Sequence, residues 1–374
     1  MKNHTNYKIF ILAGESSGDY HGSKLMYYMK RSNPEIEFIG IGGTLMQSEG
    51  LQSLVSLRKI AVMGFWEVFK KIFFFLKLEK KILTCIIKQK PNKVILIDYP
   101  GLNLRLSKKI KSYSNVPIIY YISPQIWAWK EKRVHIVKKY IDTLIVLFPF
   151  EKDWYQRYQI PVQYFGHPLI HQAKQYAYNP LKKKNIYNVA FCPGSRADEI
   201  NNHLPVLEQL LQQQKAIKGS IKVTIIKSTN TRGFHFKQLL NTYRNLTITE
   251  APLLEALQNC DFAIIASGTA TLECAAAYRP MVVIYKMSWI SWLITKKFIN
   301  IKFAAMVNVI AKQRVVPELL QSQLTPYNLI QHVNRIIYNI ESNILDNKLK
   351  SVIDTLDNGN SYKQTSNYIL DYEK

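Results

Sequence analysis

The sequence predicts an α/β protein of two doubly wound parallel-sheet domains, followed by C-terminal helices. Three observations lead to this prediction. Short runs of consecutive apolar residues alternate with helical patterns, the alternation restarts after a polar, lysine-rich stretch at residues 173–187, and the first strand of each series ends in a turn that contains glycine. Strands buried on both faces carry continuous apolar runs, and strand–helix–strand order produces parallel sheets.

The first series covers residues 1–170. Each of its predicted strands is a run of four or five mainly apolar residues, and most are followed by a helical pattern. The predicted strands are 9–13, 37–40, 94–98, 118–122 and 143–147. The turn after the first strand reads Ala-Gly-Glu-Ser-Ser-Gly-Asp at residues 13–19.

The second series covers residues 171–335. Its predicted strands are 188–192, 223–226, 262–265 and 281–285, and the first of them runs into Pro-Gly-Ser-Arg at residues 193–196. Open α/β sheets bind ligands at the carboxyl ends of their strands, so each domain is expected to hold a ligand. Neither turn has the glycine spacing of a dinucleotide or ATP site. Residues 336–374 are predicted to form a helical tail, which is polar and loosely packed over 354–364.

The composition is that of a globular, strongly basic protein. Hydrophobic residues make up 47% and charged residues 20%, a balance that excludes a disordered chain. The net charge of +24 favours a polyanionic partner, namely nucleic acid, anionic lipid or a phosphorylated substrate. A genome rich in A and T is the alternative source of the charge, because it raises the content of Lys, Asn, Ile and Tyr.

Neither a disulfide framework nor a membrane span is expected. Cys85, Cys192, Cys260 and Cys274 lie in apolar runs without metal-ligand spacing, which predicts buried thiols and no metal site. The N-terminus is short and polar, and the longest apolar stretch, 72–83, is interrupted by charged residues. We therefore expect a cytoplasmic protein without a spanning helix.

One candidate ligand site belongs to the second domain. The segment Ala-Ser-Gly-Thr-Ala-Thr-Leu-Glu at 266–273 follows a strand and opens a helix, where free N–H groups attract phosphate. Capping of that helix is the alternative role of the segment. Arg196 stands at a neighbouring strand end, where it could neutralise a diphosphate. The predicted phosphate and ribose contacts are Gly194, Ser195, Arg196, Ser267, Gly268, Thr269, Thr271 and Glu273.

The first domain carries candidate carboxylates at its strand ends. Asp98 ends a buried strand and is the leading candidate for a general base, although it could instead cap the following helix. Glu15 and Asp19 in the first turn are alternative bases. A Ser-Pro-Gln-Ile-Trp stretch at 123–127 combines an amide with an aromatic face, as sugar sites do, although two tryptophans also suit plain packing. The predicted acceptor contacts are Ser17, Asn103 and Gln125. The chain has no Asp-x-Asp pair, which argues against an acidic metal clamp.

Residues 62–90 predict a basic amphipathic helix at a membrane surface. Between 66 and 140 there are about seventeen lysines and arginines against about four acids. Aromatic residues at helical spacing among lysines fit a helix that lies in an anionic interface, whereas core packing with a solvated lysine face is the alternative. The predicted membrane contacts are Phe65, Phe69, Phe73, Leu76, Lys70 and Lys77.

Ordered motifs along residues 8–321 resemble the lipid-A-disaccharide synthases, glycosyltransferase family 19. In the first domain these are the motifs at 13–19, 40–43, 62–68, 97–106, 120–129, 148–151 and 165–169. In the second domain they are Pro-Gly-Ser-Arg-Ala-Asp-Glu-Ile (193–200), the 266–273 segment and Val-Val-Pro-Glu-Leu-Leu-Gln (315–321). The chain departs from the family at Leu102, where Phe is usual, and at Met306-Val307-Asn308, where Leu-Pro-Asn is usual.

The resemblance implies a GT-B fold, with two Rossmann-like domains facing across a cleft, and an inverting transfer in Gram-negative lipopolysaccharide synthesis. Such enzymes move 2,3-diacylglucosamine from its UDP conjugate to the 6-hydroxyl of lipid X. The resemblance implies acceptor and membrane contacts in 1–170, UDP-sugar contacts in 171–335, and Asn308, Glu318 and Gln321 near the donor. It implies anionic inner-membrane lipids as partners, peripheral binding at the cytoplasmic face, and neither metal nor cofactor. A homodimer is one compatible oligomeric state.

Two other classes of function are considered. A UDP-sugar epimerase, or a lipid-linked transferase with another acceptor, would share the donor segments but not the 123–127 stretch. A nucleic-acid-binding protein would explain the charge but would leave the Gly-Ser-Arg and Ser-Gly-Thr loops without a role. Nucleic acid is therefore not expected as a partner.

Overall fold

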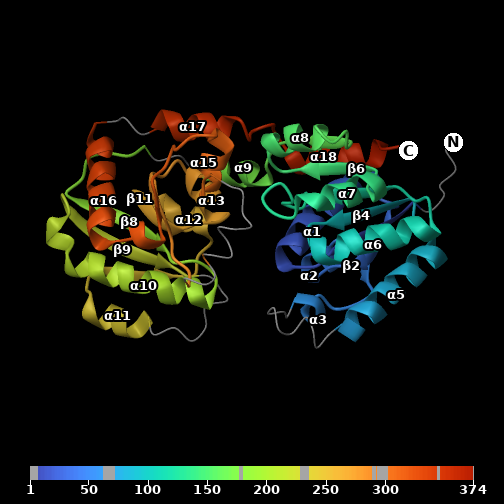
Figure 1. Ribbon diagram of the computed structural model, residues 1–374, viewed down its shortest axis with the longest axis horizontal. Helices are drawn as coiled ribbons and strands as arrows, with labels where there is room; N and C mark the ends of the chain where they lie inside the picture. Colours follow the sequence, from blue (N-terminus) through green and yellow to red (C-terminus); the bar gives the residue numbers. More distant parts are fainter. Residues whose placement is uncertain are drawn as a thin grey trace. The chain divides into compact units, whose positions relative to one another are not determined.

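The computed structural model describes residues 7–61, 72–176, 180–227, 236–288, 292, 302–342 and 346–373. The chain divides into two compact units, one made of residues 1–168 and 358–374 and the other of residues 169–357 (Figure 1). Within the described ranges, no helix is both long and apolar enough to span a bilayer. Cys192, Cys260 and Cys274 are buried and Cys85 is partly buried, all as free thiols.

The first unit is built on a seven-stranded parallel sheet with the order β3-β2-β1-β4-β5-β6-β7. The strands are β1 (Lys8–Ala13), β2 (Glu37–Ile41), β3 (Leu51–Ser53), β4 (Lys93–Ile97), β5 (Ile118–Tyr121), β6 (Thr143–Val146) and β7 (Val162–Tyr164). The helices are α1 (Ser16–Ser32), α2 (Thr44–Ser48), α3 (Arg58–Ala61), α5 (Ile72–Gln89), α6 (Pro100–Tyr113), α7 (Val134–Tyr140) after a short 3-10 turn, α8 (Pro149–Gln156) and α18 (Ser361–Asp371).

Both faces of this sheet are covered, because neighbouring residues of each strand point to opposite sides. Phe10 and Leu12 of β1 pack with apolar residues of α5, α6, α7 and α8. Ile9 and Ile11 pack on the other side with residues of α1, α2 and α18. The continuous apolar runs therefore form a central layer between two layers of helices.

The second unit has a six-stranded parallel sheet with the order β10-β9-β8-β11-β12-β13. The strands are β8 (Ile186–Cys192), β9 (Ser220–Ile226), β10 (Leu246–Thr249), β11 (Phe262–Ala266), β12 (Met281–Tyr285) and β13 (Glu318–Leu320). The helices are α10 (Ala197–Gln212), α11 (Phe236–Thr242), α12 (Leu253–Ala256), α13 (Ala270–Ala276), α15 (Met306–Ala311), α16 (Pro326–Glu341) and α17 (Asp346–Asp354). Helix α9 (Pro168–Ala173) begins where the two units join along the chain. Helices α10 and α16 share one core with the sheet.

The structure differs from the sequence prediction at the C-terminal tail. Helix α17 belongs to the second unit, whereas α18 returns to the first and packs against α1. Tyr362 is 2% exposed and Ile369 is fully buried, so the expected loose packing near 354–364 is wrong at Tyr362. Tyr362 and Ile369 are seven residues apart and so lie on one face of α18. Lys93 Nζ donates to the carbonyls of Ile369 and Leu370, at 2.6 and 2.7 Å, near the end of this helix.

Candidate active site

The carboxyl ends of β8, β11 and β12 meet at one edge of the second sheet, because these strands are parallel neighbours. The loop after β8 holds residues 193–196, the loop after β11 holds residues 267–269, and Lys286 follows β12. The predicted diphosphate contacts lie in the loops after β8 and β11. The fold thus brings the two segments to the same edge.

The loop after β8 is organised by Glu199 in the first turn of α10. Its carboxylate accepts hydrogen bonds from the backbone N–H groups of Ser195 (3.0 Å) and Arg196 (3.3 Å). Gly194 has φ of +110°, and a Cβ there would lie 2.3 Å from Glu199 Oε2, so the loop requires glycine at this position. Ser195 and Arg196 are exposed. The Arg196 side chain is 77% exposed and makes a 3.2 Å ion pair with Glu199, which leaves most of the guanidinium open to a ligand.

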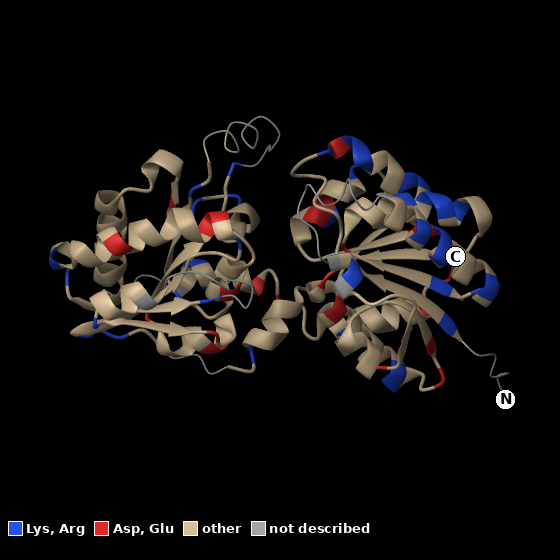
Figure 2. Ribbon diagram, turned by 90° about the horizontal axis from the view of Figure 1, so that it is seen from below, with Lys and Arg blue, Asp and Glu red and all other residues tan. Residues whose placement is uncertain are grey.

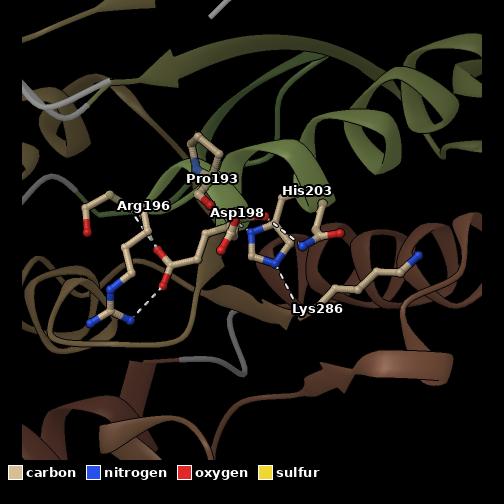
Figure 3. Close-up of polar contacts among 8 residues, drawn as sticks. Pro193, Arg196, Asp198, His203 and Lys286 are labelled. Atoms are coloured by element: carbon tan, nitrogen blue, oxygen red, sulfur yellow. Dashed lines mark hydrogen bonds and ion pairs between the residues drawn. The ribbon is translucent and has the colours of Figure 1, made fainter. Parts of the chain in front are cut away.

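His203 joins this loop to the end of β12, as Figure 3 shows. The imidazole is fully buried on α10. A carbonyl oxygen only accepts and a backbone N–H only donates, so Nδ1–H donates to the Pro193 carbonyl (2.7 Å) and Nε2 accepts from the Lys286 N–H (3.0 Å). Burial lowers the pKa of His203, which keeps the ring neutral as this pair of bonds requires. The sequence analysis missed both His203 and Glu199, although Glu three residues after the helix N-cap is a capping-box signal.

The loop after β11 presents backbone more than side chains. Ser267 Oγ donates to the Ala304 carbonyl and Thr271 Oγ1 donates to the Gly268 carbonyl, both at 2.7 Å, so these two hydroxyls stabilise the loop itself. Gly268 and Thr269 are exposed. Gly268 has φ of +149°, and a Cβ added to it would have no atom within 4 Å, so its backbone is open to approach. Burial raises the pKa of Glu273 to about 7.

Three predicted donor contacts use their polar atoms inside the fold. Asn308 is fully buried, donates to the Val316 carbonyl and to Glu318, and accepts from the N–H groups of Val315 and Val316. Glu318 also accepts from the N–H groups of Ala304 and Ala305. With its amide turned to satisfy both groups, Gln321 pairs with the backbone N–H and carbonyl of Met287. These side chains hold the segments around 304 and 287 beside the strand ends.

Asp98 is the first residue after β4 of the first unit. Asp98 and Tyr99 have φ of +44° and +47°, which is unusual for two consecutive residues with side chains. The surroundings hold this turn, because the Asp98 N–H donates to the Tyr121 carbonyl (2.9 Å) and the Asp98 carbonyl accepts from Asn103 Nδ2 (2.7 Å) and Tyr120 Oη (2.5 Å). These bonds hold the Asp98 turn at the carboxyl edge of the sheet, and all three of them use the Asp98 backbone rather than its carboxylate.

The negative charge of Glu15 affects the pKa of Asp98. Burial and the Glu15 carboxylate raise the pKa of Asp98 to about 6, against a smaller lowering by the Tyr99 N–H. Glu15 itself is exposed, at the residue that precedes α1. The two turns touch at Gly14, where a Cβ would lie 2.4 Å from the Tyr99 ring. Gly14 thus lets the Asp98 turn close onto the Glu15 turn.

Asp19 is held differently from the other two carboxylates. It is 5% exposed, and its oxygens accept from the N–H groups of Gly43 (2.7 Å), Leu45 (3.2 Å) and Met46 (3.0 Å). These bonds cap the N-terminus of α2. Among the predicted acceptor contacts, Ser17 and Gln125 are exposed, whereas Asn103 is fully buried and holds the Asp98 turn.

Helix α5 exposes apolar and basic side chains together. Phe73 is 77% exposed, Leu76 is 52% exposed, and Lys77 is exposed beside them. Phe65, Phe69 and Lys70 lie outside the described residues. Helices α5, α6 and α7 pack in sequence on one face of the sheet, and Figure 2 shows lysine and arginine positions gathered on helices of this unit, which carries both chain ends.

Comparisons with known proteins agree on a family. A family model described as Lipid-A-disaccharide synthetase matches residues 9–369. Lipid-A-disaccharide synthase 1 of Legionella pneumophila is 36% identical over 93% of this chain and 91% of its own length. The Myxococcus xanthus lipid-A-disaccharide synthase is 32% identical over 88% of each chain. Among solved structures, UDP-GlcNAc 2-epimerase of Methanocaldococcus jannaschii, in complex with UDP-GlcNAc and UDP, has a TM-score of 0.61 at 14% identity and covers 97% of this chain and 99% of its own. That likeness concerns the fold alone, which is GT-B.

Proposed function

The chain belongs to the lipid-A-disaccharide synthase family, a family of hexosyltransferases in lipid A biosynthesis, and we propose its substrates and its mechanism. The donor is UDP-2,3-diacylglucosamine and the acceptor is lipid X, 2,3-diacylglucosamine 1-phosphate. Transfer to the 6-hydroxyl of lipid X gives lipid A disaccharide 1-phosphate and UDP, with inversion at the anomeric carbon. The observation that carries this proposal is Asp98, a carboxylate with a raised pKa at a strand end of the first unit.

Asp98 acts as the general base of a single displacement. Its carboxylate takes the proton from the 6-hydroxyl while that oxygen attacks the anomeric carbon, and the bond from this carbon to the UDP oxygen breaks with its electron pair. A base with a pKa of about 6 is ionised at neutral pH and still accepts a proton effectively. Glu15 serves as the neighbouring charge that raises the pKa of Asp98.

The second unit binds the leaving group. The mostly exposed guanidinium of Arg196 balances the charge that develops on the diphosphate, and the open backbone at Gly268 lets a phosphate approach closely. Glu199, His203, Asn308, Glu318 and Gln321 support these loops from within the fold. No metal or cofactor is required by this scheme.

The enzyme works at the cytoplasmic face of the inner membrane, to which α5 binds peripherally. Its exposed Phe73 and Leu76 enter the interface, while Lys77 and its basic neighbours contact anionic lipid headgroups. Both substrates carry acyl chains, so binding at a bilayer brings the enzyme to them.

The proposal is tested by mass spectrometry of the product formed from UDP-diacylglucosamine and lipid X. We expect disaccharide from the wild type and from Asp153→Asn, an exposed control carboxylate on α8, and almost none from Asp98→Asn. Disaccharide from Asp98→Asn at the wild-type rate would move the base to Glu15. A wild type that binds UDP but forms no disaccharide would refute this acceptor, and an epimerised UDP-sugar would show a different reaction.

A further inference from the structure

A buried carboxylate of the first unit has no part in the scheme above. Glu151 lies in the first turn of α8, directly after β6, and is 2% exposed. Burial raises its pKa to about 7, against hydrogen bonds that lower it. A carboxylate is costly to bury, so its hydrogen bonds must offset a substantial loss of hydration.

The hydrogen bonds of Glu151 come from two different loops. Oε2 accepts from the N–H groups of Leu147 and Phe148, each at 3.2 Å, which is the local bond that caps α8. Oε1 accepts instead from Ser123 Oγ at 2.9 Å and from Trp127 Nε1 at 3.0 Å. Capping of α8 uses only Oε2. Oε1 ties the loop after β5 to the start of α8.

Further contacts hold the same loop. Tyr155 Oη, one helical turn beyond Glu151, donates to the Pro124 carbonyl at 2.7 Å. The Trp127 ring packs edge-on against Phe150, with ring centroids 4.8 Å apart. Residues 123, 124, 126 and 128 are buried, whereas Gln125 between them is exposed. The loop is therefore anchored on both sides of one outward-facing amide, at the carboxyl end of the strand beside β4.

We propose that Glu151 is a positioning residue of the acceptor site, which fixes the 123–127 loop so that the Gln125 amide meets a hydroxyl or phosphate oxygen of the acceptor sugar. This inference rests on the proposed function, because it assigns the acceptor to the first unit. Glu151 touches neither substrate. It acts by keeping the loop in one conformation before the acceptor arrives, which removes an ordering cost from binding.

The test compares Glu151→Gln with Glu79→Gln. Glu79 is also 2% exposed in the first unit, but its ion pairs within the described part of the chain are with Arg105 and Lys109 on the neighbouring helix. In Glu151→Gln an amide NH2 group replaces one of the two acceptor oxygens, so it faces N–H donors either at Trp127 or at the start of α8. The connection between the loop and α8 is therefore weakened. If the competent loop conformation falls to a tenth of the population, the KM for lipid X rises roughly tenfold. The KM for the UDP-sugar and the affinity for UDP stay at wild-type values.

A second measurement does not depend on activity. Hydrogen exchange without substrates, followed on the peptide that covers 122–130, is expected to be faster in Glu151→Gln and unchanged in Glu79→Gln. Trp127→Phe keeps the ring contact with Phe150 but removes one donor, and it should raise the KM for lipid X in the same direction. This milder variant decides the question if Glu151→Gln does not fold.

Two results would overturn the positioning role. One is an unchanged KM for lipid X in folded Glu151→Gln and in Trp127→Phe. The other is an equal rise in the KM of both substrates, which would indicate general loosening of the unit. A wild type that makes no disaccharide refutes the proposed function instead, and unchanged exchange in the 122–130 peptide of Glu151→Gln would then refute the anchoring by itself.

Discussion

The turn at Asp98 combines a strained backbone with an ionisable side chain. Two consecutive left-handed residues cost free energy, and the bonds from Asn103 and Tyr120 to the Asp98 carbonyl supply the compensation. The result is a carboxylate whose pKa is set by burial and by the charge of Glu15. The pH dependence of the reaction follows from this pair.

With a pKa raised to about 6, Asp98 is ionised above that pH and protonated below it. We expect kcat/KM of the wild type to fall as the pH drops through about 6, because a protonated carboxyl cannot accept the proton of the acceptor. Glu15→Gln removes a charge that raises this pKa, so the acid limb of the profile should move to lower pH. A limb that stays in place or moves to higher pH in Glu15→Gln would contradict the coupling.

Arg196 is the residue on which UDP affinity should depend most. Arg196→Ala removes a guanidinium that can bind two phosphate oxygens, and charge-assisted hydrogen bonds contribute about 1.5–3 kcal/mol. We expect the Kd for UDP, measured by calorimetry, to rise roughly 10- to 100-fold. Arg244→Ala, an exposed arginine of the same unit, is the control. Equal affinities for the two variants would remove Arg196 from the site.

The strands predicted from the sequence are the interior strands of the two sheets, each of which has a neighbouring strand on both sides: β1, β2, β4, β5, β6, β8, β9, β11 and β12. The strands that the sequence analysis missed, β3, β7, β10 and β13, are the edges of the two sheets. Edge strands here have three or four residues and fewer buried side chains, so they lack the continuous apolar run.

The site shows the same limit. Asp98 and Arg196 could be selected because they follow a strand directly in the sequence. Glu151 and His203 could not, because the hydrogen bonds that tie them to other loops join residues far apart in the sequence. The separations are 24 and 28 residues for Glu151 and 83 residues for His203. Asp19 was selected as an alternative base, but its carboxylate caps α2. The N–H groups that it binds are too far away in the sequence for a sequence pattern to reveal this role.

The cap at Asp19 predicts an effect on stability rather than on chemistry. Asp19→Ala removes the acceptor of buried N–H groups at the start of α2, which should lower the free energy of unfolding by about 1–3 kcal/mol in urea titrations. Glu35→Ala, an exposed control in the same unit, should change it little. A large fall in kcat for Asp19→Ala at unchanged stability would return this residue to the catalytic group.

Helix α5 predicts an effect on membrane binding. Replacing Phe73 and Leu76 by Ser removes the exposed apolar surface but leaves the lysines. We expect sedimentation with vesicles that contain anionic lipid to fall at least several-fold, because burial of such a side chain contributes about 1.5–3 kcal/mol. Tyr327→Ser, at a 69% exposed position on α16, is the control. Unchanged sedimentation of the double variant would refute the interfacial role of α5.

Each unit has its own sheet and core, but the first unit depends on helix α18, which follows the second unit in the sequence. Tyr362, Ser366 and Ile369 of α18 are buried against the first unit, where Ser366 Oγ donates to the Leu25 carbonyl and Tyr362 pairs with His21. The division predicted at residue 335 placed all of this sequence in a separate tail.

Ending the chain at Asp357 should therefore destabilise the first unit only. The buried Tyr362 and Ile369 side chains together contribute about 3–6 kcal/mol, so exchange in β1 and β4 should accelerate while that in β8 and β11 stays slow. UDP binding should persist. Ile369→Ala should reproduce a part of the effect and Asn367→Ala, at an exposed position, almost none. Equal acceleration in both sheets would contradict independent cores.

The return of α18 also sets the order in which the protein matures on the ribosome. Residues 169–357 are continuous, so the second unit can close its core as soon as that stretch has emerged. The first unit is translated earlier, but its core is completed only after α18 has emerged, since α18 packs against α1. The half of the enzyme that is synthesised first is thus completed after the half that is synthesised second.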